Sequence, residues 1–464
     1  MTDDIASLYY SLLMKIIFCF ATLFILAGFM LNNYFFAKFV SYDGTLEPST
    51  EHLIFFVQII NLCFGILLGM LSWRMKYFSP KTKERIINFS FLLFTIFFFF
   101  LMLELGVRIV FPSQEIVSFA GTDPAVFEES TIIPWTLKPN ASARFVALDF
   151  DTQININSLG LRDKERSLEK DNNTYRILVL GDSFTYGFGV NNNETYSAIL
   201  ENLLNTQSSL GTNKKFEVWN AGFASGYTED TFYLYLREKG FEFKPDMVLV
   251  GMYVENDVLD FSKNNYTYDK SGKLIRITSD FYHIENGNLR RGSSTEVSPT
   301  ERAILYFKKF LLKYSRTYSY LSSAISSITT KNNNPLFDSE YSNEINDNFN
   351  KVEYYLSQIK KLGDENNITV AVILFPGKTS IGSLWQQYLT QNPGSIRDKP
   401  ENMILSYCQN LNITCLDLWP YFTNSTDGTK YYFVHDAHWS QKGNQKGAEI
   451  IHQLLLSENM TGIQ

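Results

Sequence analysis

The chain has 464 residues, of which 45% are hydrophobic and 19% charged, and it carries a formal net charge of −7. A chain of this length is expected to fold into more than one structural unit. The negative charge and the lack of a clustered basic face argue against a nucleic-acid partner, because phosphate binding requires such a face.

The N-terminal region, residues 1–111, is strongly apolar. Three stretches, 16–37, 53–73 and 86–103, contain no charged side chain. Each approaches the ~20 residues with which a helix crosses a bilayer. We therefore predict three transmembrane helices, since a cleaved signal peptide would account for only one such stretch.

The two loops between these stretches differ in charge. Residues 41–52 contain three acidic and no basic side chains, whereas residues 74–85 contain five Lys or Arg. The positive-inside rule places the second loop and the N-terminus in the cytoplasm and everything after the third stretch outside. No charge lies within a stretch, where a transport site would need one, so we interpret residues 1–111 as an anchor in the lipid bilayer and not as a transporter subunit.

The remainder divides into a lead-in segment, residues 112–174, and a domain over residues 175–464 in which apolar runs alternate with helical periodicity. Strands are predicted at 176–181, 216–220, 247–254, 368–376 and 413–419. Helices are predicted at 194–205, 228–240, 343–365, 400–410 and 441–456. This alternation predicts an α/β fold with a doubly wound parallel sheet, in which ligands bind at the carboxyl ends of the strands.

The alternation is interrupted at about 258–340, where the chain is polar and rich in Tyr, Ser and Asn. We predict an insertion that caps a site or binds a partner. A hairpin is expected at 268–277 and a helix at 301–314.

The first predicted strand leads into Gly181-Asp182-Ser183. Ser183 follows a buried strand and precedes a helix, a place where either a nucleophile or a helix N-cap is found. This segment alone leaves both interpretations open. It contains no GxSxG elbow, P-loop or complete GxGxxG motif.

Two further strand ends carry candidate groups. Asn256, in the sequence Val-Glu-Asn-Asp, can donate its side-chain amide to an oxyanion, although Asn-Asp pairs also form turns. Gly222 and Gly226 follow the second strand, where glycines commonly serve the turn itself.

His435-Asp436-Ala437-His438 stands before the last helix. A neutral imidazole beside a carboxylate is the usual general base for a serine. A metal site formed by His435, Asp436 and His438 is the alternative. No further His or Cys is placed to complete such a site, so we predict no metal.

Cys408 and Cys415 are seven residues apart, between a predicted helix and a strand. A disulfide would require an oxidising compartment. We favour two unpaired buried thiols over a disulfide.

The order of these segments resembles the GDSL/SGNH hydrolase family over residues 175–456. The resemblance implies a flavodoxin-like SGNH fold with Ser183 as the nucleophile. It also implies that Asp436 and His438 complete a catalytic triad. The polar stretch 156–163 is similar to leader sequences of envelope members of the family.

The resemblance further assigns the oxyanion hole to the backbone amides of Ser183 and Gly226 and the side-chain amide of Asn256. Gly226 is preferred to Gly222 because Gly-Tyr-Thr resembles the family's Gly-x-Ser/Thr. Asp182 receives a supporting role.

Two departures from the family pattern concern the third and last blocks. Asn256 stands in Val-Glu-Asn-Asp and not in Gly-x-Asn-Asp, and Asp436 and His438 are two residues apart instead of three. The histidine followed by Trp439 resembles a subgroup linked to polysaccharide O-acetylation.

The predicted function is an extracytoplasmic serine ester hydrolase acting on envelope glycans, glycoconjugates or lipid esters, without metal or organic cofactor. One alternative is an O-acetyltransferase that modifies cell-surface polysaccharide and requires a membrane acyl-transfer partner. Another is a non-catalytic envelope assembly component that keeps the fold.

Overall fold

The computed structural model describes residues 48–74, 77–110, 126–146, 149–207, 214–223, 226–280, 282–285, 288–291, 333–423, 428–434, 436–458 and 460, and scattered positions in 11–32 and 308–322. The chain forms two compact units, residues 1–112 with 297–320 and residues 113–296 with 321–464. Most of the helix predicted at 301–314 and part of the apolar stretch 16–37 lie outside the described residues.

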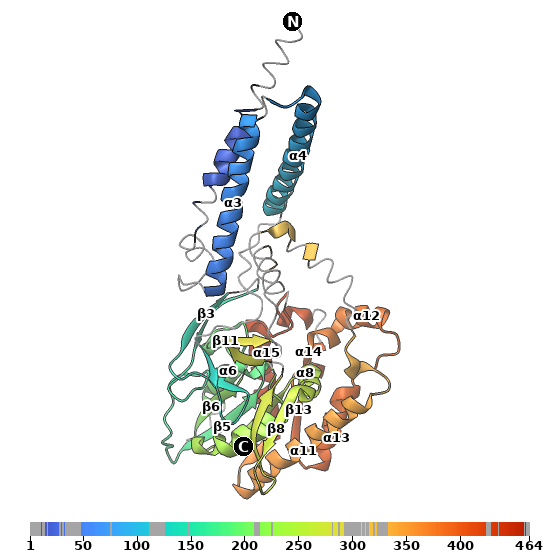
Figure 1. The fold of residues 1–464 in the computed structure, drawn as a ribbon. Helices are drawn as coiled ribbons and strands as arrows, with labels where there is room; N and C mark the ends of the chain where they lie inside the picture. Colours follow the sequence, from blue (N-terminus) through green and yellow to red (C-terminus); the bar gives the residue numbers. More distant parts are fainter. Residues whose placement is uncertain are drawn as a thin grey trace. The chain divides into compact units, whose positions relative to one another are not determined.

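The first unit contains two long helices, α3 (Pro48–Arg74) and α4 (Pro80–Val110), drawn in blue in Figure 1. The apolar stretches 53–73 and 86–103 lie within them. Large apolar side chains are exposed on both helices, among them Leu67 and Phe99. Over the residues that the structure describes, no helix combines the length and the apolar character that crossing a membrane requires.

Part of the predicted insertion belongs to this first unit. Glu104 in α4 accepts hydrogen bonds from the backbone N–H groups of Arg316 at 2.9 Å and Thr317 at 3.1 Å, and from the Ser315 hydroxyl at 3.0 Å. Residues 297–320 therefore fold with residues 1–112, which the sequence did not indicate.

The second unit is built on a five-stranded sheet whose strand order is β13-β12-β7-β5-β6, with every pair parallel. The strands are β5 (Thr174–Gly181), β6 (Lys215–Gly222), β7 (Met247–Met252), β12 (Thr369–Leu374) and β13 (Thr414–Asp417). The predicted parallel α/β sheet is confirmed. Because β6 lies on one side of β5 and β7 on the other, the sheet has its topological switch point at the carboxyl end of β5.

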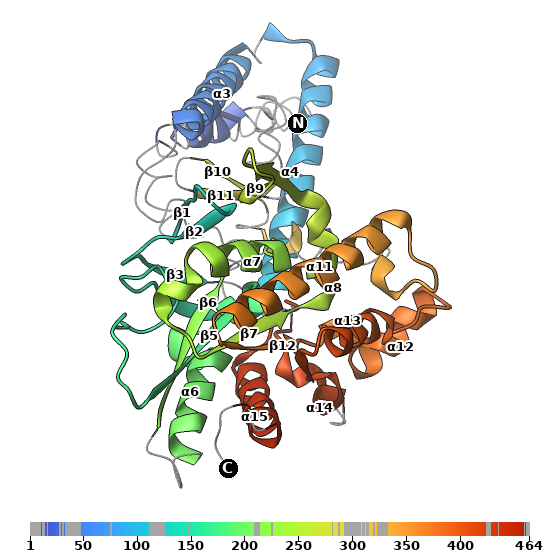
Figure 2. The same cartoon turned by 90° about the horizontal axis from the view of Figure 1, so that it is seen from below.

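Helices cover both faces of this sheet (Figure 2). One face carries α6 (Tyr196–Gln207) and α15 (Gln441–Ser457), and the other carries α7 (Glu229–Glu238) and α11 (Asn343–Glu365). In β5, Ile177 and Val179 pack in the first layer, while Leu178 and Leu180 pack in the second. A strand buried on both faces is apolar at consecutive positions, which is the pattern that made β5 recognisable.

Several smaller elements surround the sheet. The predicted hairpin is present as β8 (Asn264–Tyr268) and β9 (Leu274–Ser279). The sequence did not predict β1 (Phe127–Glu129), β2 (Trp135–Leu137), β3 (Ser142–Val146), β4 (Asp151–Asn155), β10 (Tyr282–Glu285), β11 (Asn288–Arg291), α12 (Gly382–Gln391) or α14 (Trp419–Thr423).

The prediction for the two cysteines was wrong. Cys408 lies in α13 (Lys399–Asn410) and Cys415 lies in β13. They form a disulfide with 6.1 Å between their Cα atoms, because β13 returns directly past the end of α13.

A row of three glycines crosses the carboxyl ends of the central strands. Gly181 in β5 pairs with Gly222 in β6 and with Gly251 in β7. The short helix α5 (Ser183–Tyr186) rests on this row, since a Cβ at Gly222 would approach the backbone nitrogen of Tyr186 to 2.2 Å. The missing side chains allow α5 to lie directly on the sheet.

A buried arginine of the lead-in segment donates hydrogen bonds to the residues that end and follow α5. Arg162 is 1% exposed and donates to the carbonyl oxygens of Tyr186 at 2.7 Å, Gly187 at 2.6 Å, and Val190. Its guanidinium also lies 4.4 Å from the centre of the Tyr186 ring. The lead-in segment is therefore part of the support of α5.

We predict that Gly222→Ala lowers the free energy of unfolding by about 3 kcal/mol, because the new methyl group meets backbone that cannot rotate away. Urea unfolding followed by circular dichroism measures the effect. Gly272→Ala is the control, since Gly272 has φ +83° and open space around it. It should cost about 1 kcal/mol through the backbone alone. Equal losses for both variants would contradict the packing argument.

Candidate active site

Ser183 is the first residue of α5, at the switch point of the sheet, and it is 2% exposed. The N-cap of α5 is Asp182, whose Oδ1 accepts a hydrogen bond from the backbone N–H of Phe184 at 2.9 Å. The interpretation of Ser183 as an N-cap was therefore wrong. Its hydroxyl is available for other partners because the preceding residue does the capping.

The Ser183 hydroxyl meets the histidine predicted from the C-terminal motif. Ser183 Oγ lies 2.7 Å from His438 Nε2, and His438 Nδ1 lies 2.5 Å from Asp436 Oδ1. The backbone N–H of His438 donates to the same Asp436 oxygen at 2.8 Å. We call this series the Ser183–His438–Asp436 relay. His435, the third residue of the metal alternative, lies outside the described residues.

Two aromatic side chains pack against the imidazole ring. The ring centre of His438 lies 4.4 Å from that of Phe188 and 5.1 Å from that of Phe184. Burial opposes ionisation of Asp436, but the hydrogen bond and charge of His438 outweigh it and lower the pKa of this carboxyl. An ionised carboxylate beside Nδ1 favours the tautomer in which Nδ1 carries the proton. Nε2 is then free to accept the proton of the serine hydroxyl.

The predicted amide donor lies beside the serine. Asn256 is in the short helix α8 (Val254–Asp260), since β7 ends two residues earlier than predicted. Its Nδ2 lies 3.4 Å from Asp182 Oδ2, and Ser183 Oγ lies 3.3 Å from the same oxygen. Asp182 therefore contacts both the serine and the amide, and its supporting role stays a prediction.

The two candidate glycines, Gly222 and Gly226, differ in the surroundings of their backbone N–H groups. The backbone N–H of Gly222 donates to Asn220 Oδ1 at 2.9 Å, and Gly222 lies under α5. Gly226 has φ +87° and precedes Tyr227 and Thr228 at the start of α7. The amide of Gly222 is thus occupied, which favours Gly226 as the donor.

Buried acids lie around Asp182. Glu229 and Asp257 are both 0% exposed, and neither oxygen of Glu229 has a hydrogen-bond partner within the part of the chain that the structure describes. Burial and the charges of Asp230 and Asp182 raise the pKa of Glu229 to about 8. Burial and the charges of Asp182 and Glu229 likewise raise the pKa of Asp257. No motif in the sequence assigns a role to either residue.

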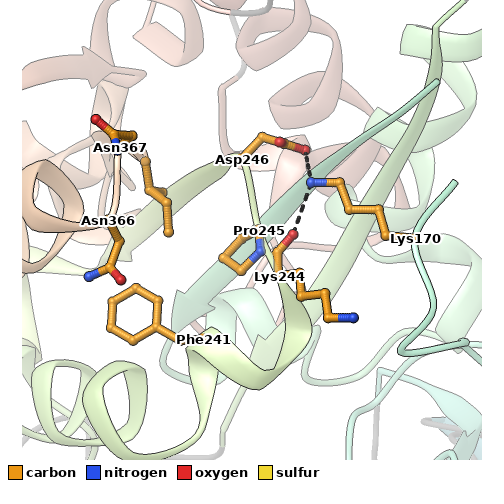
Figure 3. A pocket seen from close by; sticks show the side chains of 8 residues that line it. Lys170, Phe241, Lys244, Pro245, Asp246, Asn366 and Asn367 are labelled. Carbon is orange, nitrogen blue, oxygen red and sulfur yellow. Dashed lines mark hydrogen bonds and ion pairs between the residues drawn. The ribbon is translucent and has the colours of Figure 1, made fainter. Parts of the chain in front are cut away.

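A pocket of about 310 Å³ lies at the amino ends of the strands, whereas Ser183 lies at their carboxyl ends (Figure 3). Asp246 and Ile368, which precede β7 and β12, are among its lining residues. Lys170 closes one side, donating to Asp246 Oδ2 at 2.6 Å and to the Lys244 carbonyl at 3.1 Å. Because this pocket lies at the amino ends of the strands, it is separate from the relay.

A serine, an imidazole and a carboxylate in hydrogen-bonded series at the carboxyl ends of a parallel sheet define a class, the serine hydrolases. A model of the GDSL-like lipase/acylhydrolase family matches residues 177–451, more than half of the chain. The chain belongs to this family, and the protein is a serine hydrolase that acts on ester bonds.

The solved structures that match this chain have low sequence identity and low TM-scores. A lipase/acylhydrolase from Enterococcus faecalis is 13% identical, over 61% of this chain and 96% of that chain, with a TM-score of 0.33. A GDSL-like lipase from Bacteroides thetaiotaomicron is 11% identical, over 64% and 93%, with a TM-score of 0.30. An esterase from Pseudoalteromonas sp. is 10% identical, over 62% and 98%, with a TM-score of 0.30. No curated protein sequence matches this chain.

We predict that Glu229→Gln makes the protein more stable at alkaline pH. From pH 4.5 to about 8 the unfolded chain has released this proton while the folded chain keeps it, so the free energy of unfolding falls as the pH rises through this window. The variant lacks that loss, and its advantage over the wild type should be large at pH 8 and small at pH 5. Urea unfolding across this range measures it, with the exposed Glu340→Gln as the control. An advantage independent of pH would contradict the assignment.

Proposed function

We propose that the protein is a membrane-anchored, extracytoplasmic esterase that removes acyl groups, such as acetyl, from envelope glycans, glycoconjugates or lipid esters through an acyl-Ser183 intermediate. The observation that carries the chemistry is the Ser183–His438–Asp436 relay, with 2.7 Å between Ser183 Oγ and His438 Nε2. A general base must stand within this distance of the proton that it removes.

In the first half-reaction, Ser183 Oγ bonds to the ester carbonyl carbon while His438 Nε2 takes the hydroxyl proton. The carbonyl oxygen becomes an oxyanion. When the tetrahedral intermediate collapses, the ester C–O bond breaks and His438 returns the proton to the departing alcohol. Asp436 stabilises the imidazolium between these two steps.

The oxyanion would be bound by the backbone amides of Ser183 and Gly226 and by Asn256 Nδ2. An amide nitrogen carries two hydrogens, so the contact of Asn256 with Asp182 leaves one for the oxyanion. The loss of one such donor typically lowers the rate by ~100- to 1,000-fold. In the second half-reaction water attacks the acyl carbon and His438 takes its proton. The bond between Ser183 Oγ and the acyl carbon then breaks, His438 returns the proton to Ser183 Oγ, and a carboxylic acid leaves.

The location is supported by the sequence and by two features of the described residues. The uncharged stretches 53–73 and 86–103 and the basic loop 74–85 are typical of an anchor with its following domain outside. The exposed apolar side chains of α3 and α4 would be covered by lipid. The Cys408–Cys415 disulfide is typical of an oxidising compartment.

We predict that Ser183→Ala in the full-length protein in detergent lowers the turnover of 4-nitrophenyl acetate by at least ~1,000-fold. Ser262→Ala, at an exposed serine, serves as the control and should keep wild-type turnover. Retention of activity in Ser183→Ala would sink the proposed nucleophile. An added oligosaccharide that becomes acetylated, at the expense of free acetate, would identify the acceptor as a sugar hydroxyl instead of water.

A separate prediction concerns the location. The expressed protein should stay in the membrane pellet after alkaline carbonate and enter the supernatant only with detergent. Protease added outside intact spheroplasts should digest the catalytic domain and leave a tag at the N-terminus protected. Release by carbonate, or protection of the catalytic domain, would contradict the proposed topology.

A further inference from the structure

We propose that Lys378 is a positioning residue for the esterase reaction, because its ammonium group holds the segment that carries Asp436 and His438. Lys378 follows β12 and opens the short helix Lys378–Ser380. It lies outside the segments that carry the resemblance to the family. The inference rests on the proposed function, since it assigns Lys378 to the support of the relay.

The ammonium group donates to three backbone carbonyl oxygens of one segment. Lys378 Nζ lies 2.6 Å from the oxygen of Phe433, 2.8 Å from that of Val434 and 3.1 Å from that of Asp436. An ammonium has three N–H donors. All three are therefore directed at the few residues that precede His438.

The two arms of this segment are paired below the turn. A bridge joins Tyr432 and Trp439, the Phe433 N–H donates to the His438 carbonyl at 3.0 Å, and the Ser440 N–H donates to the Tyr431 carbonyl at 2.8 Å. The turn beyond this ladder carries Val434, which is 77% exposed and adds little packing. Lys378 thus ties the turn that contains Asp436 to the carboxyl end of β12.

The charge of Lys378 also acts on the relay. It lies close enough to Asp436 to contribute to the lowered pKa of this carboxyl. The charged groups that act on the Lys378 ammonium are the carboxylates of Asp149 and Asp436. The carboxyl group of Asp182 interacts with His438. Removal of the cation would favour protonation of the Asp436–His438 pair, so the acidic limb of the kcat/KM profile should move to higher pH.

The chain offers a matched control in Lys399. Its ammonium also donates to two carbonyl oxygens of a loop, those of Asp338 at 2.9 Å and Ser339 at 2.8 Å, and it lies 3.4 Å from the centre of the Tyr341 ring. Neither of those loop residues belongs to the relay. Lys399→Met therefore removes the same kind of clamp from a loop that carries no residue of the relay.

The experiment compares Lys378→Met, Lys378→Arg, Lys399→Met and Ser183→Ala in the full-length protein with 4-nitrophenyl acetate. Lys378→Met should lower kcat by ~10- to 100-fold, since small displacements of a catalytic group have effects of this size. Its KM should stay within about threefold of wild type, and its acidic limb should move up in pH. Lys378→Arg keeps the charge and should recover part of kcat with the limb unmoved. Lys399→Met should lose stability with kcat and the limb unchanged.

The inference is overturned if Lys378→Met keeps wild-type kcat while Ser183→Ala is inactive. It is equally overturned if the loss in Lys378→Met equals its unfolded fraction measured by circular dichroism. Activity in Ser183→Ala would refute the proposed nucleophile instead. Should Lys378→Met not fold, Lys378→Gln replaces it, because this side chain keeps an N–H donor without the charge.

Discussion

The contact between α5 and the glycine row of the sheet is the constraint on which the rest of the site depends. Gly181, Gly222 and Gly251 stand in register on adjacent strands, so the backbone of α5 can approach to a distance that no Cβ would permit. The position of Ser183 is thereby set by the sheet and not by a flexible loop. Sites carried on rigid elements hold the geometry that a proton transfer needs.

Two cations complete this support from opposite ends of the relay. Arg162 binds the carbonyl oxygens after α5, and Lys378 binds those before His438. Carbonyl oxygens accept these hydrogen bonds without neutralising the cations, so each keeps a charge near the site. Lys378 lies outside the segments that resemble the family. Arg162 lies in the stretch 156–163, whose resemblance to leader sequences gives no role to its arginine.

The sequence predicted the parts whose signal is local. The strands β5, β7 and β12 are continuous apolar runs, and Ser183, Asn256 and His438 follow strands or precede a helix in the expected order. The hairpins β1–β2 and β3–β4 have three to five residues per strand and depend on contacts with distant segments, so no periodicity marks them. The disulfide and the folding of residues 297–320 with residues 1–112 likewise depend on tertiary proximity. Asp182 as the N-cap could have been inferred, because Asp is as good a cap as Ser.

The buried acids next to Asp182 show what this arrangement costs in stability. Glu229 and Asp257 are fully buried, and burial together with the charge of Asp182 raises the pKa of each. Burial also raises the pKa of Asp182. Such a cluster is unfavourable for folding. Asp182 is nevertheless the group that caps α5 and contacts both Ser183 and Asn256. The same carboxyl that organises the nucleophile and the amide donor therefore contributes to this unfavourable cluster, so the arrangement that positions Ser183 lowers the stability of the core around it.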